Sequence, residues 1–545
     1  MSPTRLLLPL VLACPLCAQG TVSEGLTLFQ PVGSTTAYLV DTTGTVVHEW
    51  AGTQRPGLSV YLLEDGTLLR TTRQQGGPQG GPASVQKVAW DGTITWSYTL
   101  PSPAYRQHHD VEILPDGNVL VVAWEDLTAA DAIQAGRNPS FTSATFSPDS
   151  VLEIEPVGTS GGNIVWEWHA IDHVIQDFDP TKDNFGVVAD HPELLDINYP
   201  PGNLNNGDWN HVNAIDYNAE LDQIMISSRT LNEVWIIDHS TTTAEAAGHT
   251  GGNSGRGGDL LYRYGNPLAY RAGTAADQRF FAQHNAQWIE QGLPGQGNML
   301  VFNNGVGRPA GPFSTVEELV LPVDPQGNYS LAPGSAYGPT SSFWTYQAPV
   351  PTSLYSSIIS GAQRQPNGNT LVCSGAQAWF FEVTSLGQLV WEYTNPFPLQ
   401  GNRNVFRAEK YSPCIPFATE ALEIVRLGVP PNPDALRPGS TSGPVLGATW
   451  DPWIDHASFF PNALVDVLVV NQLAPVNVPS PLGTLLCQIP SSTLVFTQFP
   501  IQTNFQVAIP TDCAFAGVEV CAQGASVGGG VIQATNALDL VLGTY

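Results

Sequence analysis

Two short patterns of apolar and polar residues recur between about residues 25 and 415 and predict a protein built mainly from β-strands. The first pattern is a polar turn followed by an apolar strand, and it appears as EDGTLLRT, PDGNVLVV, GQGNMLVF and PNGNTLVC. The second is a strand that ends on an aromatic residue, and it appears as GTVVHEW, GTITWSY, GNIVWEW and GQLVWEY. Asp-Gly and Asn-Gly pairs in the turns supply the positive φ angle that a tight hairpin requires. The patterns therefore predict repeated β-hairpins.

The two patterns recur in units of roughly 50–75 residues, which is typical of the blades of a β-propeller. The available length fits about six units, so we predict an all-β fold with a six-bladed β-propeller over residues 25–415. A β-sandwich of hairpins is the alternative, but it does not explain why both patterns recur together. Because a propeller gathers loops from every blade around one axis, residues far apart in the sequence meet there.

Other stretches depart from the repeat. Residues Asp172–Pro201 and Ser240–Ala276 have the composition of loops, and loops this long are often functional. After about Ala418 the composition changes, and GVPPNPDALRPGSTSGP is typical of a linker or of the opening of a new unit. Short alternating strands such as LVDVLVVNQ follow. We therefore interpret residues 425–545 as a small C-terminal β-domain with the character of a β-sandwich.

The N-terminus has the features of a secretory signal peptide. Arg5 precedes an apolar run over Leu6–Cys14, and small residues follow at Cys17 and Ala18, which predicts a signal peptide over residues 1–18. A buried N-terminal strand is the alternative. The run is shorter than the roughly 18 apolar residues of a membrane span, and no later segment is long and apolar enough either. We therefore predict a secreted or periplasmic protein without a membrane span.

Five cysteines remain after removal of the predicted signal peptide, namely Cys373, Cys414, Cys487, Cys513 and Cys521. An oxidising compartment permits disulfides between them. The odd number leaves at least one thiol unpaired within the chain, and the sequence does not determine the pairing.

The charge of the chain excludes several functions. The 545 residues include 20 Lys and Arg against 48 Asp and Glu, which gives a formal net charge of −28. So negative a protein is not expected to bind nucleic acid or an acidic membrane surface. Only 12% of the residues are charged and 42% are hydrophobic, so wholesale disorder is not expected either. An anionic substrate would require a local cationic group.

Candidate chemistry lies where polar residues interrupt the strand-like patterns. The segments are RQHHD with His108 and His109, DWNHVN with His211 and Asn213, SSR with Arg229, and FAQHN with His284. Three of them place a histidine at the start of an inner hairpin, where propeller strands face the axis, so we expect His109, His211 and His284 to converge. Each histidine alone is also typical of a structural or surface residue. Three neutral imidazoles can bind zinc or iron, but no HxH or HExxH spacing supports such a site, and we assign no metal ligand.

The combination of HHDVEILPDGN, GDWNHVNAIDYN, ISSR, QHNAQWIE with VFNNG, and GNTLVCSG with FFEVTSLGQLVWEY resembles the bacterial aryl-sulfate sulfotransferases over about residues 25–415. The resemblance implies a six-bladed propeller. It also implies an enzyme that moves a sulfuryl group from an aryl sulfate donor to a phenolic acceptor, without a nucleotide sulfate donor and without a cofactor.

The resemblance also implies roles for four catalytic residues. His284 corresponds to the histidine that becomes transiently sulfated. His211 and Arg229 correspond to residues that hold the sulfuryl oxygens, and His109 matches a further active-site histidine. A neutral imidazole is a competent nucleophile near pH 7, and a guanidinium offers a planar fork of donors to an anion. A protonated His211 or His109 would stabilise the leaving phenolate oxygen.

Three neighbouring positions complete the comparison with the family. Asn213 matches a polar contact, and Asn213 and His108 are the predicted substrate-binding residues. His108 is a second candidate for the position of His109, although its neighbour's place directly before an acid favours His109. Asn285 follows His284 where the family commonly has an acid.

Other motifs carry weaker predictions. Asp177, Asp179 and Asp183 have the spacing of a calcium loop, but the EF-hand glycine and terminal glutamate are missing, so a solvated acidic loop is favoured. The glycine run over Gly248–Asp259 lacks the ending of a phosphate loop, and we interpret it as a flexible insertion near the propeller mouth. A non-catalytic secreted propeller that binds a ligand or protein, or a histidine-metal site on the axis, remains the alternative to the sulfotransferase.

Overall fold

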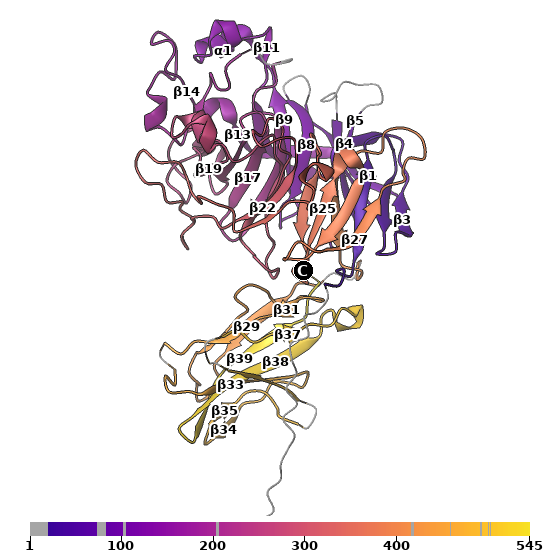
Figure 1. The fold of residues 1–545 in the computed structure, drawn as a ribbon, viewed down its shortest axis with the longest axis vertical. Helices are drawn as coiled ribbons and strands as arrows, with labels where there is room; N and C mark the ends of the chain where they lie inside the picture. The colour runs from indigo at the N-terminus through magenta and orange to yellow at the C-terminus, as the bar shows by residue number, and fades with distance from the viewer. Residues whose placement is uncertain are drawn as a thin grey trace, which may run out of the picture.

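The computed structural model describes residues 20–73, 83–101, 105–202, 207–415, 419–457, 459–490, 493–499, 501 and 503–544, so the predicted signal peptide over residues 1–18 lies outside the described residues. Figure 1 shows a larger N-terminal body, coloured indigo to orange, and a smaller C-terminal body, coloured mainly yellow. Strands dominate the regular structure of both bodies, which confirms the prediction of an all-β protein.

The described part of the N-terminal body consists of antiparallel four-stranded meanders. From the first strand to the outermost they are β28 (Val405–Tyr411), β1 (Leu26–Pro31), β2 (Ala37–Val40), β3 (Val46–Trp50); β4 (Arg55–Leu62), β5 (Leu68–Arg73), β6 (Ala83–Val88), β7 (Ile94–Thr99); β8 (Tyr105–Ile113), β9 (Val119–Glu125), β12 (Asp149–Val157), β13 (Gly161–His169); β16 (Val212–Asn218), β17 (Gln223–Ser228), β18 (Glu233–Asp238), β19 (Tyr262–Tyr264); β20 (His284–Trp288), β21 (Met299–Asn303), β22 (Thr315–Leu319), β23 (Trp344–Tyr346); and β24 (Gly361–Arg364), β25 (Thr370–Ser374), β26 (Trp379–Val383), β27 (Leu389–Thr394). A parallel bridge between Leu58 and His109 joins β4 to β8.

The first strands of the meanders form a closed ring. They contact one another in the order β28, β4, β8, β16, β20, β24 and back to β28. The ring closes because β28, from the far end of this body, pairs with β1 in an antiparallel ladder that begins at Leu26 and Tyr411. A radial arrangement of this kind is propeller-like, and it directs the starts of the first strands toward a common axis.

The two sequence patterns occupy constant places in the meanders. The turn–strand segments form the second strands β5, β9, β21 and β25, and the segments ending on an aromatic residue form the outermost strands β3, β7, β13 and β27. The second strands are buried almost throughout, whereas most positions of the outermost strands are exposed or half-buried. A strand covered on both faces reads as a continuous apolar run, which explains why the two patterns differ.

Side chains on the first strands lock neighbouring meanders together. Asp110 accepts a hydrogen bond from the backbone N–H of Ile215 (3.2 Å), Asp216 from that of Trp288 (2.5 Å), and Asn285 from that of Ala362 (2.8 Å). Each bond crosses from one meander to the next. These bonds satisfy buried backbone donors and fix the positions at which the strands approach the axis.

Short elements make up the insertions between the strands. They are β10 (Leu127–Thr128), α1 (Ala129–Gln134), β11 (Thr145–Phe146), β14 (Val174–Ile175), β15 (Leu195–Asp196), α2 (Thr243–Ala246) and 3-10 turns at Pro139–Phe141, Ala170–His173, Val188–Asp190, Pro267–Tyr270, Ala275–Asp277, Pro351–Ser353 and Gly375–Gln377. Figure 1 places α1, β11 and β14 together at the end of the body remote from the C-terminal body. Among the described residues, none of the helices has the length and apolar character needed to cross a bilayer.

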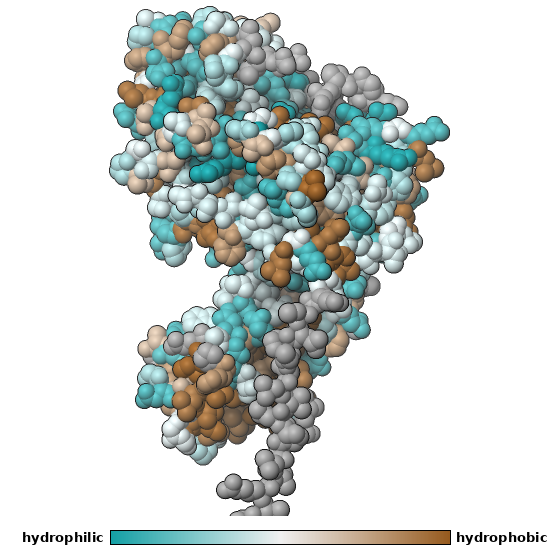
Figure 2. All heavy atoms as spheres, viewed as in Figure 1, coloured by the Kyte–Doolittle hydropathy of each residue, from teal (hydrophilic) through white to brown (hydrophobic). Residues whose placement is uncertain are grey.

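The C-terminal body is built around a five-stranded antiparallel sheet. Its order is β29 (Leu422–Arg426), β39 (Val531–Val541), β38 (Glu519–Gly528), β33 (Val465–Asn471) and β36 (Leu494–Gln498), and shorter ladders pair β30 (Leu436–Arg437) with β32 (Trp453–Ile454), β31 (Thr449–Trp450) with β37 (Val507–Ala508), and β34 (Val478–Ser480) with β35 (Gly483–Leu485). Trp450 from a short ladder packs in one buried cluster with Leu468 and Leu538 of the sheet. Figure 2 shows apolar residues on the surface of this body, whose exposed apolar side chains include Ile424 and Leu494.

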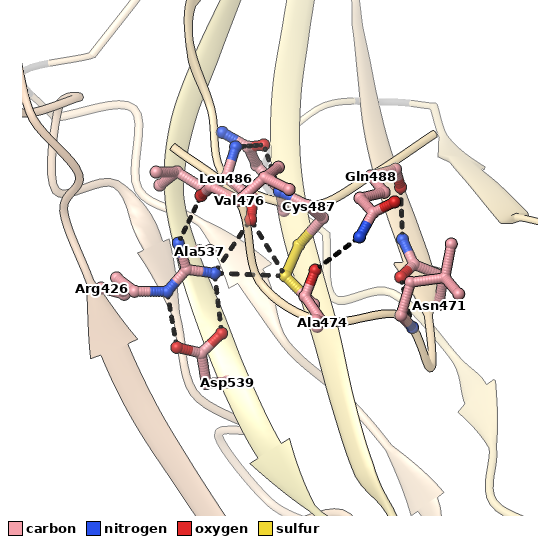
Figure 3. Close-up of a disulfide and its surroundings, with 12 residues drawn as sticks. Arg426, Asn471, Ala474, Val476, Leu486, Cys487, Gln488, Ala537 and Asp539 are labelled. Carbon is pink, nitrogen blue, oxygen red and sulfur yellow. Dashed lines mark hydrogen bonds and ion pairs between the residues drawn. A yellow bond between two sulfur atoms is a disulfide. The ribbon is translucent and has the colours of Figure 1, made fainter. Parts of the chain in front are cut away.

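Two disulfides stabilise the region after β28. Cys414 pairs with Cys513 and Cys487 with Cys521, and a buried Cys373 carries the free thiol of the described chain. Figure 3 shows the second disulfide beside Arg426, which forms an ion pair with Asp539 and donates to the backbone carbonyl oxygens of Val476 and Leu486. The structure thus supplies the pairing that the sequence left open.

We predict that the chain without residues 1–18 shows no reactive thiol when native and one per molecule after denaturation. Burial raises the pKa of the Cys373 thiol, and the other four described cysteines are bonded. Titration with a chromogenic disulfide reagent before and after guanidinium treatment measures both numbers. A count of three or five thiols in the denatured protein would contradict the assigned pairing.

Candidate active site

The strands that carry the predicted histidines share one backbone feature. His109, His211 and Asn285 each have a φ angle of 51°, and the register of β8, β16 and β20 shifts near them. A left-handed conformation is uncommon for residues other than glycine, costs about 1–3 kcal/mol and clusters at functional sites. The same bulge therefore turns the backbone at equivalent places in three consecutive meanders.

The predicted catalytic side chains lie close together. The rings of His109 and His211 are 4.7 Å apart between centroids. Phe406, from β28, lies 6.0 Å from the ring of His109 and 6.4 Å from that of His284. The charge of Arg229 acts on the pKa of both His109 and His284. Residues separated by more than 170 positions in the sequence thus form one cluster at the ring axis.

His284 has a defined tautomer and is uncharged. Its Nδ1 lies 2.8 Å from Oδ1 of Asn304 and 3.1 Å from the carbonyl oxygen of Ala282, and its Nε2 lies 3.1 Å from the backbone nitrogen of Ile359. Because both partners of Nδ1 accept and the Ile359 N–H donates, the assigned proton is on Nδ1 and the lone pair on Nε2. Burial, aided by the charge of Arg229, lowers the pKa of His284 to about 3. The imidazole is therefore neutral at pH 7.

His211 is held by a carboxylate. Its Nδ1 lies 2.5 Å from Oδ2 of Asp208, whose other oxygen accepts a hydrogen bond from Nε1 of Trp124 (3.0 Å). Burial acts to raise the pKa of Asp208, but the hydrogen bond and charge of His211 outweigh it and leave the pKa below its usual value. This contact orients the imidazole of His211 through its Nδ1 atom. The sequence motif contained Asp208, but its spacing alone did not assign it a role.

His108 lies behind His109. The two Nδ1 atoms are 2.7 Å apart, the ring of His108 stacks on Trp124 at 3.8 Å, and Nε2 of His108 lies 2.6 Å from Oδ1 of Asp149. Burial lowers the pKa of both histidines well below the usual value. His108 therefore contacts His109 and is itself held by Trp124 and Asp149.

Arg229 supplies a positive charge next to His211. Its backbone N–H donates to the carbonyl oxygen of His211 at 3.1 Å. Burial lowers its pKa from an unusually high normal value, so the guanidinium remains charged at pH 7. Within the described part of the chain, no carboxylate lies within ion-pair distance of this side chain. A half-buried cation without an ion-pair partner among the described carboxylates is suited to an anionic ligand.

Asn213 and Asn285 join meanders. Nδ2 of the buried Asn213 donates to the carbonyl oxygen of Gln283 (2.8 Å), directly before His284, and its Oδ1 has no partner among the described residues. Asn285 faces the next meander, where it accepts the bond from Ala362. The orientation of His284 therefore depends on Asn304, from the VFNNG segment, and does not require an acid at position 285.

The histidines on the axis do not form a metal-ligand group. In the described ranges, one group of three potential ligands has donor atoms within 4.8 Å of one another, and it consists of His173, His249 and Asp259. The acidic residues of the calcium-like loop are not part of such a group. Asp179 instead accepts bonds from Thr181 of its own loop.

A cavity of about 1580 Å³ lies between the N-terminal and C-terminal bodies and does not touch the three histidines. Its acidic lining residues include Glu112, Asp216, Glu290 and Glu409. Burial raises the pKa of all four, and that of Asp216 and Glu409 to about 7. The lining also includes the cationic residues Lys87, Arg364, Arg407 and Lys410, so it carries groups of both signs. The histidine cluster remains the candidate site because the predicted catalytic residues meet there and not in this cavity.

The closed ring of sheets thus brings His109, His211 and His284 to the guanidinium of Arg229. A model of the family described as Arylsulfotransferase (ASST) matches residues 17–396. The chain belongs to this arylsulfotransferase family, which confirms the resemblance found in the sequence.

Other comparisons contribute no further argument. No curated protein matches the chain. A protein of unknown function from Bacteroides caccae is 13% identical over 71% of this chain and 98% of its own, with a TM-score of 0.38. The periplasmic gluconolactonase of Pseudomonas aeruginosa is 13% identical over 70% and 97%, with a TM-score of 0.33. Virginiamycin B lyase from Staphylococcus aureus is 10% identical over 69% and 86%, with a TM-score of 0.33.

The low pKa of His284 predicts a pH dependence of stability. Below about pH 6.5 the unfolded chain binds a proton at this residue that the native protein does not bind until about pH 3. The contribution of the neutral His284 to the free energy of unfolding is therefore fully present above pH 6.5 and is lost as the pH falls. We expect the melting temperature of His284→Asn to fall less between pH 7 and pH 4.5 than that of the wild type, as measured by calorimetry.

The exposed His191, which pairs with Glu193, provides the matched control. His191→Ala should keep the pH dependence of the wild type. An equal fall in melting temperature for His284→Asn and wild type would show that His284 is not buried in the neutral form.

Proposed function

We propose that the protein is a secreted or periplasmic aryl-sulfate sulfotransferase that works through a sulfated His284. The observation that carries the proposal is the neutral His284, with its lone pair on Nε2, in the same cluster as the unpaired Arg229. Membership of the arylsulfotransferase family supports the type of activity. The donor is an aryl sulfate and the acceptor a phenol, and no cofactor takes part.

In the first half-reaction, Nε2 of His284 attacks the sulfur atom of the donor. The N–S bond forms, the bond between sulfur and the aryl oxygen breaks, and the electron pair leaves on that oxygen. Sulfuryl transfer resembles phosphoryl transfer, with charge on the equatorial and leaving oxygens, so Arg229 and His109 stabilise the equatorial oxygens. The N–H of Ile359, which donates to Nε2, must release the lone pair before attack.

Proton transfer belongs to His211 in this scheme. Asp208 holds Nδ1, so a protonated Nε2 donates its proton to the leaving phenolate oxygen, as an imidazole oriented by a carboxylate does in other enzymes. In the second half-reaction the neutral Nε2 accepts the proton of the acceptor phenol. The phenol oxygen then attacks sulfur, and the N–S bond breaks to regenerate His284.

We also propose the domain organisation. The closed ring is a six-bladed propeller over residues 25–415, because β28 (Val405–Tyr411) completes the meander that begins with β1 and lies beyond the family match. Residues 425–545 form a separate β-sandwich-like domain. The two disulfides are consistent with export, which the predicted signal peptide over residues 1–18 would direct.

His284→Ala should abolish transfer from 4-nitrophenyl sulfate to phenol, with a loss of more than about 10⁴-fold in kcat/KM. Release of 4-nitrophenolate measures the rate. The wild type incubated with donor alone should carry a sulfuryl group on His284, detected by mass spectrometry of the intact protein and its peptides. His191→Ala should behave as the wild type.

Full activity of His284→Ala would contradict the covalent mechanism. Absence of activity and of labelling in the wild type, with a range of aryl sulfates, would instead favour a non-catalytic propeller that binds a ligand or protein.

Arg229→Ala should lower kcat/KM by about 10²–10³-fold, because one preorganised contact to the transition-state charge is lost. The kcat/KM of Arg229→Lys should lie between those of the wild type and Arg229→Ala, since a lysine keeps the charge but not the planar fork of donors. The melting temperatures of all three proteins check that the fold is intact. A loss of less than twofold in Arg229→Ala would show that this guanidinium does not hold the sulfuryl group.

A further inference from the structure

A second cluster of polar side chains lies outside the proposed active site. His173 ends the 3-10 turn at Ala170–His173 that follows β13, and His249 and Asp259 lie in the glycine-rich loop that follows α2. Nδ1 of His173 is 2.9 Å and Nδ1 of His249 is 2.7 Å from the same Oδ1 of Asp259. All three potential ligand atoms lie within 4.8 Å of one another.

The hydrogen-bond partners of His173 both accept, so a neutral ring cannot satisfy them with its single N–H. Its Nε2 lies 2.8 Å from the carbonyl oxygen of Ala246, which only accepts, so Nε2 carries the proton. In a neutral ring, the lone pair of Nδ1 then points at the carboxylate of Asp259, which also only accepts. A cation between the two atoms, either a second proton or a metal ion, removes this repulsion. A backbone carbonyl on the other ring nitrogen is also the usual support for a metal-ligating histidine.

The surroundings hold the cluster in place. The ring of Trp168 stacks on that of His173 with an interplanar angle of 3°, and its Nε1 donates to the carbonyl oxygen of Gly258 (2.8 Å). A Cβ atom at Gly258 would lie 2.6 Å from Nε2 of His173 and 2.0 Å from the carbonyl oxygen of Ala246. Glycine is therefore required at this position so that the loop packs onto the imidazole.

The ligand types indicate the metal. Two imidazoles and one carboxylate suit zinc and similar divalent transition metals, whereas calcium and magnesium prefer oxygen ligands. Bonds of about 2.0–2.2 Å place tetrahedral ligand atoms roughly 3.3 Å apart, so small side-chain movements would admit the ion. His173 is fully buried, but the side chain of His249 is 60% exposed, which leaves a position for water.

We propose that His173, His249 and Asp259 bind one divalent transition metal ion of the zinc class, with water as a further ligand. The ion connects the loop after α2 to the end of β13 and so links two neighbouring meanders. The site is separate from the histidine cluster around His284 and is not required by the sulfotransferase proposal.

Cobalt provides a direct test, because Co²⁺ in a site of low coordination number absorbs visible light. The full protein, dialysed against a chelator, should bind one equivalent of Co²⁺ with visible absorption that one equivalent of Zn²⁺ abolishes. His249→Ala and Asp259→Asn should each weaken binding at least tenfold. His249 is largely exposed, so its replacement should not prevent folding.

Two further variants make the assignment specific. His191→Ala replaces another exposed histidine paired with a carboxylate and should bind the metal as the wild type does. His284→Ala should also bind normally, which separates this site from the axis. Zn²⁺ should raise the melting temperature of the wild type but not that of His249→Ala.

Absence of binding by the wild type, or equal affinity in His249→Ala, would overturn the proposal and leave the three residues as a hydrogen-bonded cluster. Because none of these measurements uses sulfuryl transfer, the metal site and the proposed activity succeed or fail independently.

Discussion

The antiparallel pairing of β1 with β28 is the interaction on which the N-terminal body depends. It begins by joining Leu26 to Tyr411, 385 positions apart in the sequence, and it closes the ring of meanders. The same strand brings Phe406 to the rings of His109 and His284. Its next residue, Arg407, forms a buried ion pair of 2.8 Å with Asp110. Ring closure and the geometry of the histidine cluster are therefore one constraint, because the strand that completes the first sheet also completes the site.

Burial and the pairing of charged groups then decide what the cluster can do. A protein with a net charge of −28 needs a local cation to hold an anionic substrate. Around the axis, burial keeps His109 and His284 neutral, and Arg229 has no carboxylate partner in the described chain. The carboxylates near the cluster contact histidines instead, that of Asp208 contacting His211 and that of Asp149 contacting His108. This arrangement leaves Arg229 as the local cation for a sulfate ester.

Much of the fold could be predicted because the burial of a strand determines its pattern of apolar and polar residues. The apolar turn–strand segments correspond to second strands, and the aromatic-ended segments to outermost strands. The convergence expected of His109, His211 and His284 likewise followed from their place before inner hairpins. The partners of these rings could not be assigned in the same way. Asn304 and Asp208 reach His284 and His211 through loops whose path depends on packing, and the glycine run, interpreted as flexible, is a hydrogen-bonded loop packed on Trp168.

The sequence by itself determined the all-β class, the arylsulfotransferase family and the residue types available for chemistry, because hydrophobic periodicity and local motifs are properties of neighbouring residues. The tertiary structure decided which side chains meet. It paired the cysteines, assigned the tautomer of His284 through Asn304 and Ile359, and brought His249 and Asp259 to His173. These outcomes depend on contacts between distant segments, and such contacts exist only once the ring has closed and the loops have packed against it.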